Sequence, residues 1–285
     1  MACAKSRREQ GMKVFLTKGL SWGLALILCV LLALLCFSCK PDREEPQVEE
    51  PVVEEPAPTY VSPYDWSCLF FEDGRFVYKK DWVFTSLTGI DVSEHQGEID
   101  WDAVALDGID FAIIRVGHRG YSEGETYLDE QLYANIEGAH NAGIKVGVYF
   151  FSQAINEREA IEEAEVVIRA LEGIPIEYPV FYDYEPIGGA NGRANYLTNE
   201  QLTLNTRAFC ERIEAAGYVA MIYGNKRVIG RIDPELRDRY GVWFAEYEVM
   251  TPSAQFDFII WQYSSRGTVA GIQTNVDMNI HFLSP

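Results

Sequence analysis

The chain has 285 residues, 48% of them hydrophobic, which is enough to bury the core of one large domain or two small ones. Its formal net charge is −19, with 43 acidic residues against 24 basic ones. Because contact with phosphate groups needs clusters of basic residues, this charge argues against nucleic acid or an anionic membrane surface as a partner.

The first 38 residues have the composition of an export signal. The basic lead MACAKSRREQGMKVFLTKG is followed by the uncharged run LSWGLALILCVLLALLCFSC. The end of this run, with Ser38 before Cys39 and a charged, Pro-rich segment after it, resembles a bacterial lipoprotein signal. Residues 1–38 would then be a cleaved signal peptide and Cys39 the lipidated first residue, with an uncleaved membrane anchor as the alternative. Both place the rest of the chain outside the inner membrane, either exported or lipid-anchored in the cell envelope, as on the outer membrane of a diderm bacterium.

Two short segments separate this signal from the main domain. Residues 39–62 are acidic and Pro-rich, with too few large apolar groups to offset the entropy of ordering the chain, so we predict a disordered tether. Residues 63–87 hold Asp73 and Gly74 between two strand-like arms, which predicts a small β-hairpin.

From residue 88 to residue 285, short apolar runs alternate with stretches of helical period. Eight runs are predicted as strands, at residues 89–92, 109–117, 145–152, 178–185, 218–224, 242–247, 258–263 and 275–282. The clearest helices are predicted at residues 129–142, 156–171 and 199–216, each ending near a glycine. Apolar strands that alternate with helices indicate a parallel sheet covered by helices. We therefore predict an α/β fold, an irregular TIM-like (β/α) barrel with about five β/α units and then strands with short crossovers, preceded by the hairpin.

A barrel of this kind carries its chemistry at the C-terminal ends of its strands. Polar residues stand at or near the ends of the predicted strands, and they converge on one face if the fold is right. They are Asp91, Arg115, Ser152, Asp183, Glu185, Tyr223, Glu246, Tyr247, Gln262, Asp277 and Asn279.

The stretch VFYDYEP places two of these acids, Asp183 and Glu185, two residues apart on one strand. Their side chains point the same way, with backbone positions about 6.6–7 Å apart. Cleavage of a glycosidic bond needs such a pair, one acid to protonate the leaving oxygen and one anion to support positive charge at the anomeric carbon. Burial among aromatic neighbours would raise the pKa of one carboxyl, and mutual repulsion would separate the two pKa values. The structural alternative is a salt-bridged or solvated pair at a strand end.

A third acid stands at the end of the first barrel strand, in GIDVSEHQGEIDW. Ser93 and Asp100 are explained as caps of helical turns. Asp91 is not, because an acid flanked by Ile90 and Val92 needs a partner or a function.

These motifs, taken together, resemble a known family of enzymes. Residues 88–283 contain, in order, DVS with QG, then IDW, FAIIRVGHRGY, GVYFFSQA, PVFYDYEP, MIYG, WQY and VDMN. Each is weak alone, but in this order they resemble glycoside hydrolase family 25, the N-acetylmuramidases often called Chalaropsis-type lysozymes.

The resemblance implies an irregular (β/α) barrel that hydrolyses the β-1,4 bond between N-acetylmuramic acid and N-acetylglucosamine in peptidoglycan. Glu185 then matches the catalytic acid, Asp183 and Asp91 match the two further acids, and Asp277 matches an acid of the closing strand. The family is considered retaining, with the substrate's own 2-acetamido group as one candidate nucleophile. In that case Asp183 would orient or polarise this group; backbone spacing alone leaves retention and inversion open.

Other polar and aromatic residues near the strand ends are candidates for substrate binding. Arg115 ends a buried run, where an unpaired charge is costly, so we expect it to pair with a site carboxylate or to reach substrate. The remaining candidates for substrate binding are Tyr149, Tyr223, Tyr247, Gln262 and Asp277.

The sequence implies neither a metal nor a cofactor. The four histidines lack metal-binding spacing, and no HExxH motif occurs. Cys68 and Cys210 are expected to stay unpaired. We expect the loop at residues 117–125 to be flexible and to form a rim over the cleft, and the Glu-rich helix 156–171 to be a solvated outer face.

Two rival functions remain open. The first is a glycan-binding lipoprotein that keeps the barrel without catalysis, although binding alone does not need a desolvated pair of carboxyls. The second is a glycosidase for another N-acetylated polymer, such as chitin. The expected partners are peptidoglycan glycan strands and, through the lipid anchor, a membrane; the protein is expected to be a monomer.

Overall fold

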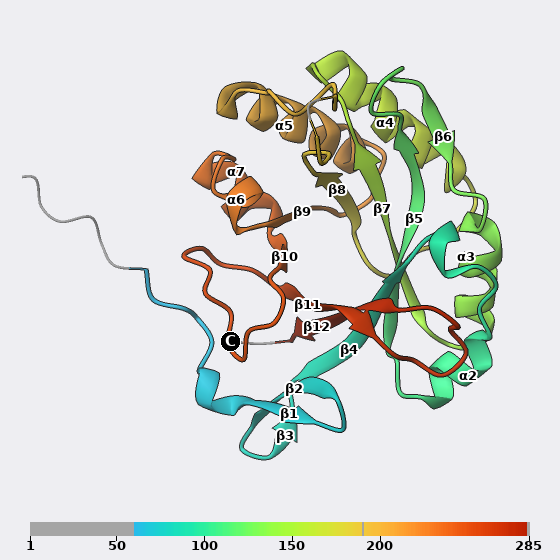
Figure 1. Cartoon of the computed structure of the whole chain (residues 1–285), viewed down its shortest axis with the longest axis vertical. Helices are drawn as coiled ribbons and strands as arrows, with labels where there is room; N and C mark the ends of the chain where they lie inside the picture. Colours follow the sequence, from blue (N-terminus) through green and yellow to red (C-terminus); the bar gives the residue numbers. More distant parts are fainter. Residues whose placement is uncertain (1–59, 190, 284–285) are drawn as a thin grey trace, which may run out of the picture. The chain divides into compact units, whose positions relative to one another are not determined.

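A computed structural model describes residues 60–189 and 191–283 of the protein (Figure 1). The signal peptide predicted for residues 1–38, the lipidation site at Cys39 and most of the tether predicted for residues 39–62 lie outside the described residues. Among the helices that are described, none is both long enough and apolar enough to cross a membrane.

The described chain contains twelve strands, six α-helices and two short 3-10 helices. The strands are β1 (Leu69–Glu72), β2 (Arg75–Lys80), β3 (Val83–Phe84), β4 (Ser86–Val92), β5 (Phe111–Arg119), β6 (Thr126–Leu128), β7 (Lys145–Ser152), β8 (Val180–Tyr184), β9 (Ala220–Asn225), β10 (Val242–Ala245), β11 (Ile260–Gly267) and β12 (Val276–Phe282). The helices are α2 (Trp101–Leu106), α3 (Leu132–Asn141), α4 (Glu157–Ala170), α5 (Asn199–Ala215), α6 (Lys226–Ile229) and α7 (Pro234–Tyr240), and the 3-10 helices are η1 (Trp66–Cys68) and η2 (Glu94–Gln96).

Eight of these strands close into a barrel. The order around the sheet is β4, β12, β11, β10, β9, β8, β7 and β5, and the pairing of β4 with β5 closes it. All neighbours in the barrel pair in parallel except β12, which is antiparallel to both β11 and β4. The predicted fold is confirmed: strands β4, β5, β7, β8 and β9 are each followed by helix, and β10, β11 and β12 are joined without helices (Figure 1).

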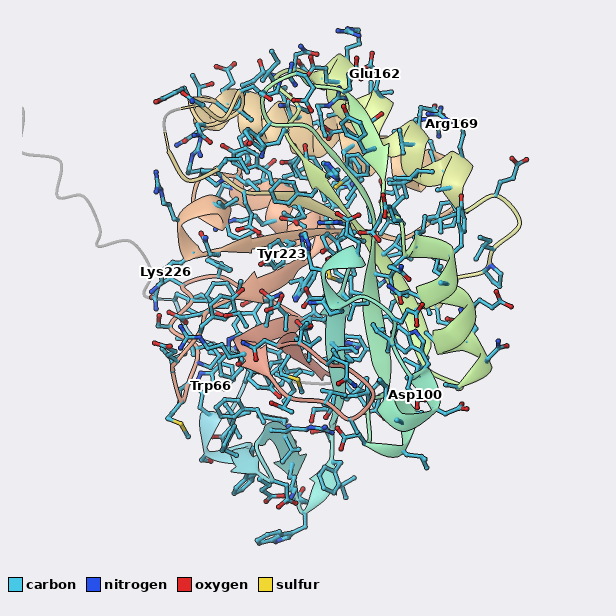
Figure 2. All side chains as sticks on the ribbon, turned by 45° about the vertical axis from the view of Figure 1, so that its right-hand side comes forward. Trp66, Asp100, Glu162, Arg169, Tyr223 and Lys226 are labelled. Atoms are coloured by element: carbon cyan, nitrogen blue, oxygen red, sulfur yellow. The ribbon has the colours of Figure 1, made fainter. Side chains whose placement is uncertain are left out.

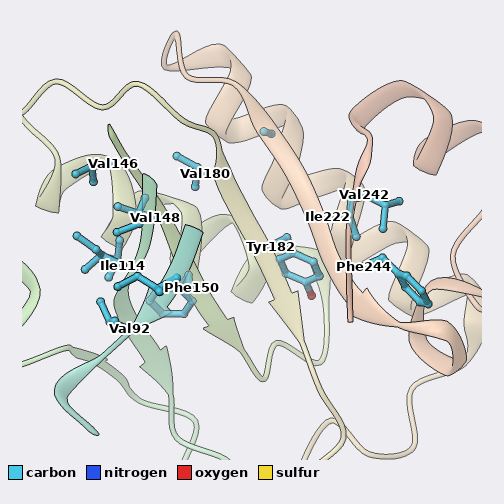
Figure 3. Packing of buried hydrophobic residues seen from close by; sticks show 14 of the residues in the cluster. Val92, Ile114, Val146, Val148, Phe150, Val180, Tyr182, Ile222, Val242 and Phe244 are labelled. Atoms are coloured by element: carbon cyan, nitrogen blue, oxygen red, sulfur yellow. The ribbon is translucent and has the colours of Figure 1, made fainter. Parts of the chain in front are cut away.

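Strand residues alternate between the inside of the barrel and its outer layer, as the two-residue period of a strand requires. The outer layer packs beneath the helices and includes Ile114 of β5, Val148 of β7, and Val180 and Tyr182 of β8, all labelled in Figure 3. The inner cluster is separate, and it is made largely of Phe111, Ile113, Phe181, Met221, Tyr223 and Trp243.

The inner cluster fills the barrel below the polar residues at the strand ends. Phe111 lies stacked on Tyr178, with ring centroids 4.6 Å apart. A Cβ at Gly89 would come within 2.2 Å of the Phe111 ring, and one at Gly147 within 2.7 Å of the Tyr178 Cβ. Glycine at these two positions therefore makes room for the aromatic rings that fill the barrel.

The segment before the barrel covers the side that lacks helices. The predicted hairpin is present as β1 and β2, with Asp73 and Gly74 at φ +49° and +81° in its turn, and β3 extends it to three antiparallel strands. Phe76 packs on Trp261 of β11 with ring centroids 4.8 Å apart, and the Tyr64 hydroxyl donates to the Phe258 carbonyl at 2.8 Å. Aromatic packing by this small sheet thus shields β11 and β12, where crossover helices are missing (Figure 1).

Two expectations about outer segments are wrong. Helix α4 is solvated only in part: Glu162 and Arg169 point outward (Figure 2), but Glu159 is 7% exposed and Glu163 is fully buried. The loop predicted at residues 117–125 also begins later than expected, because β5 continues to Arg119 and forms a hairpin with β6. The sequence does not reveal that Arg119 turns inward to pair with α4.

Candidate active site

A pocket of about 270 Å³ lies at the C-terminal ends of the barrel strands. All nine residues that the sequence singled out as catalytic or substrate-binding line it, together with Phe151, Trp243 and Ser265. The nine are Asp91, Arg115, Tyr149, Asp183, Glu185, Tyr223, Tyr247, Gln262 and Asp277. Figure 2 shows Tyr223 at the centre of the barrel; the roles of these residues remain predictions.

Asp183 and Glu185 enter the pocket from the end of β8. The Asp183 side chain is 3% exposed, and its Oδ1 atom has no hydrogen-bond partner among the described residues. Glu185 follows the last residue of β8 and is half-buried. The Gln153 side-chain amide donates to the Glu185 backbone carbonyl at 2.8 Å, so the segment that carries the second acid is fixed to the end of β7.

Asp91 accepts two hydrogen bonds from neutral amides. The Gln262 Nε2 atom donates to its Oδ2 atom at 2.7 Å, and the Asn279 Nδ2 atom donates to the same oxygen at 2.8 Å. Asp277 stands opposite Asp91 in the antiparallel pair of β12 and β4. The two acids are therefore neighbours across strands, and Asp91 is held from two sides.

Aromatic residues fix the orientation of both amides. The Tyr223 and Tyr247 hydroxyls donate to Gln262 Oε1 at 2.8 and 2.6 Å, which leaves the Gln262 nitrogen to face Asp91. The Trp243 indole donates to Asn279 Oδ1 at 2.7 Å, with the same consequence for Asn279. The network thus presents two donors to one carboxylate oxygen, and these two bonds act against the rise in the pKa of Asp91 that burial causes.

The ion pairs of Arg115 differ from the expected pairing with an acid of the site. Its Nε atom donates to Asp129 Oδ2 at 2.7 Å, and its Nη2 atom lies 2.9 Å from Glu94 Oε1. Asp129, at the start of the α3 region, was not singled out as a partner, because nothing in its sequence context points to β5. Arg115 still lines the pocket, where its charge acts against the rise in the pKa of Asp183.

The four carboxyl groups of the pocket all have pKa values above their ordinary range. Burial is the main cause for each one. Repulsion from Glu185 and Asp91 raises the pKa of Asp183 further, and repulsion from Asp277 acts on Asp91 and Glu185. The pKa of Asp277 reaches about 6. A cluster of this kind retains protons near neutral pH, because its carboxyls cannot all ionise together.

The arrangement supports proton donation and charge stabilisation by carboxyl groups. In the described part of the chain, no group of three or more His, Cys, Asp or Glu side chains is arranged to hold a metal ion. The pocket combines a partly exposed acid, Glu185, which directly follows β8, with a deeper acid, Asp183, inside that strand. One carboxyl group of the pocket can donate a proton to a ligand atom that accepts it, while a second carboxyl group lies beside the first.

The chain matches a family of known proteins over most of the barrel. A sequence profile of Glycosyl hydrolases family 25 matches residues 90–272. Autolytic lysozyme from Clostridium acetobutylicum is 27% identical over 194 residues, which span 68% of this chain and 55% of that protein.

Solved structures are similar to the barrel as well. The bacterial lysozyme from Streptomyces coelicolor has a TM-score of 0.57 and 25% identity, over 68% of this chain and 90% of that one. The autolysin LytC from Streptococcus pneumoniae, solved with a synthetic peptidoglycan ligand, has a TM-score of 0.61 and 24% identity, over 74% of this chain and 51% of that one. The chain thus spans little more than half the length of LytC and of the clostridial autolysin.

Proposed function

Because the chain belongs to Glycosyl hydrolases family 25, we propose that it is a muramidase that hydrolyses the β-1,4 bond between N-acetylmuramic acid and N-acetylglucosamine in peptidoglycan. The observation that carries the proposal is the pocket itself, in which Glu185, Asp183, Asp91 and Asp277 meet with raised pKa values. The relation to an autolytic lysozyme and the peptidoglycan ligand of LytC support the choice of substrate.

Glu185 is the general acid in this mechanism. Glu185 is more exposed than Asp183, the other acid at the end of β8. Its pKa is raised mainly by burial and then by repulsion from Asp277. Its carboxyl proton passes to the glycosidic oxygen while the bond from that oxygen to the anomeric carbon breaks. The ionised Glu185 then takes a proton from the water whose oxygen completes the new hydroxyl group.

Asp183 supports the positive charge that develops at the anomeric carbon. Its Oδ1 atom has no partner among the described side chains, so this oxygen is available to the substrate or to its 2-acetamido group. Burial and repulsion from Glu185 and Asp91 raise the pKa of Asp183, and Arg115, which lines the same pocket, acts against this rise, so the proposed role uses the ionised fraction of Asp183. The resulting anion in a buried site stabilises a cationic transition state more strongly than it would in water.

Asp91 and Asp277 complete the site from the opposite side of the barrel. Burial raises the pKa of both carboxyls, and their mutual interaction raises the pKa of Asp91 further while it opposes the rise at Asp277. Together with Gln262 and Tyr247 they offer polar groups that can bind the sugar on the far side from β8. Arg115, Tyr149 and Tyr223 are assigned to substrate binding in the same way, as lining residues of the pocket.

Product analysis tests this function. Purified protein is incubated with peptidoglycan and, separately, with chitin oligomers, and the products are identified by mass spectrometry. We expect muropeptides with N-acetylmuramic acid at the new reducing end, and none from the Glu185→Gln variant. The matched control, Glu172→Gln in the exposed turn that follows α4, should leave the products unchanged.

The rival functions give different products. Cleavage of chitin alone would assign the site to another N-acetylated polymer. Strand binding without any cleavage would assign it to a non-catalytic glycan-binding protein. For location, we propose a lipid anchor at Cys39 that holds the domain in the cell envelope; labelling with a radioactive fatty acid that is lost in Cys39→Ala would support it.

A further inference from the structure

A second and larger cavity begins at the edge of the catalytic pocket. It has a volume of about 950 Å³, and it shares Tyr247 and Ser265 with the walls of the 270 Å³ pocket. The two cavities are therefore neighbours with a common border. A ligand that leaves the catalytic pocket past Tyr247 enters this groove.

The groove is built partly by the segment before the family match. One wall is the tip of the β1–β2 hairpin, with Phe71, Asp73 and Arg75. The others are the loop after β10, at residues 247–250, and the end of β11, at residues 263–268. Because the family match starts at residue 90, the hairpin wall belongs to this chain and not to the matched region.

The hairpin wall is fixed in place. Arg75 donates to the Asp107 backbone carbonyl and, at 2.6 Å, to Asp107 Oδ2, which also accepts from the Ala270 backbone N–H at 3.0 Å. Phe76 lies 5.1 Å, centroid to centroid, from the Tyr263 ring of β11. A groove that is ordered before binding loses little conformational entropy when a ligand enters it.

Exposed apolar side chains border the groove. Phe71 is 53% exposed, Met250 is 68% exposed and Tyr247 is 39% exposed. Large apolar side chains that are exposed together around a concave surface mark a binding site more often than chance placement does. Aromatic faces are also suited to the apolar C–H faces of sugar rings.

The charges of the groove favour an uncharged ligand. Arg75 pairs with Asp107, and Arg266 lies 3.9 Å from Glu248, so the two arginines are matched by acids while Asp73 adds a further negative charge. A peptide stem rich in carboxylates would meet no net positive charge here. The N-acetylglucosamine units of a glycan strand are neutral, and their hydroxyl and acetamido groups can bond to both kinds of side chain, whereas each N-acetylmuramic acid without a stem carries a single carboxylate.

We propose, on the basis of the muramidase function above, that this groove binds further sugar units of the glycan strand whose scissile bond lies in the catalytic pocket. The catalytic pocket, at about 270 Å³, lies just below the range for ligand sites of about 300–1,000 Å³, so a polymer has to continue outside it. Tyr247 guides the strand over the border, and Phe71 and Met250 support the ring faces beyond it.

The test compares long and short substrates. The ratio of kcat/KM on long peptide-free glycan strands to kcat/KM on the shortest saccharide that the protein cleaves is measured for each variant. Phe71→Ala and Met250→Ala should each lower this ratio about five- to ten-fold, because a central contact of a binding site is lost. The matched control is Trp82→Ala, which removes an 87% exposed aromatic ring from the same small sheet, outside the groove, and should leave the ratio unchanged.

Each other outcome has a defined meaning. An unchanged ratio in both groove variants overturns the proposal, and a loss seen only with peptide-bearing strands overturns it in favour of a site for the stem peptide. If the wild-type protein cleaves nothing, the muramidase function fails instead. In that case, binding of long peptide-free strands is measured by calorimetry. Weaker binding by Phe71→Ala than by the wild-type protein supports the proposed role of the groove, and equal binding overturns it.

Discussion

Two groups of buried carboxyl groups lie close to the ends of β7 and β8, and they differ in what stands beside them. On α4, Glu159 accepts from Arg193 at 3.0 Å, and Glu163 accepts from the Arg119 Nε atom at 2.7 Å. In the pocket, Asp183 Oδ1 has no hydrogen-bond partner among the described residues. Among the residues that the structure describes, Arg115 is the one arginine that lines the pocket, and it is paired with Asp129 and Glu94.

The difference separates acids that hold the fold together from acids that are available for chemistry. An arginine partner opposes the effect of burial: Arg193 lowers the pKa of Glu159 despite burial, whereas burial still raises the pKa of Glu163 to about 7 with Arg119 beside it. A buried carboxyl without such a partner keeps a proton more readily, as at Asp183. Burial alone therefore does not distinguish the two groups; the absence of a committed cation does.

The largest effect is expected for Asp183→Asn. This change should lower kcat about 10²- to 10³-fold, because the charge opposite the developing cation is lost while the shape is kept. Stability should stay equal or rise slightly, since a buried carboxyl with a costly charged form is replaced by a neutral amide. Muropeptide release and thermal unfolding measure the two quantities. If the Tm falls far enough for unfolding to account for the lost activity, Asp183 acts by stabilising the fold and not in the reaction.

The opposite pattern is expected for Glu159→Gln. Here Arg193 loses its carboxylate partner, and because the Arg193 side chain is 18% exposed the cost is about 2 kcal/mol of unfolding free energy. For a domain of this size, that corresponds to a fall in Tm of about 4–8 °C. Activity per folded molecule should change little. Selective loss of activity with an unchanged Tm would break the distinction between the two groups of acids.

The pH dependence of stability sharpens the comparison further. Burial raises the pKa of Glu163 to about 7 even with Arg119 beside it, and the pocket acids are raised as well. A group whose pKa is higher in the folded state binds more protons there, so its contribution to stability is complete below the unfolded-state value and is lost as pH rises through the folded-state value. The Tm should therefore fall by a few degrees between pH 4.5 and pH 7.5.

Glu163→Gln should make this fall smaller, whatever its effect on the Tm at a single pH, because one of the titrating groups is removed. Thermal unfolding across the pH series gives the comparison. An exposed acid replaced in the same way, Glu172→Gln, should leave the slope unchanged. Parallel curves for wild type and Glu163→Gln would show that Glu163 does not titrate in this range.

Most of the barrel could be predicted because its strands differ clearly from its helices in apolar period. The eight predicted strands overlap the barrel strands, and Asp100 caps α2 as expected by accepting from the Ala103 backbone N–H at 3.1 Å. The third strand of the small sheet was missed, since β3 is only two residues long and exposed. The domain boundary predicted at residue 88 lies inside β4, which begins at Ser86.

The residues of the pocket could be predicted because strand ends meet on one face of a closed barrel. Their pairing could not, because partners come from distant parts of the chain. Gln153 binds the Glu185 backbone from the end of β7, and Asp129 takes the charge of Arg115 from the start of α3. Glu163 and Arg119 are 44 positions apart in sequence, and a Glu-rich helix gives no sign of which glutamate turns inward.

The proton on Glu185 is the central claim, and substrates with different leaving groups test it most directly. The Glu185→Gln variant is assayed on peptidoglycan and on an aryl glycoside of N-acetylmuramic acid whose phenolate departs without protonation. We predict a loss of about 10²- to 10⁴-fold in kcat on peptidoglycan and a loss of less than about ten-fold on the aryl glycoside. Equal losses on both substrates would contradict the assignment of Glu185 as the general acid.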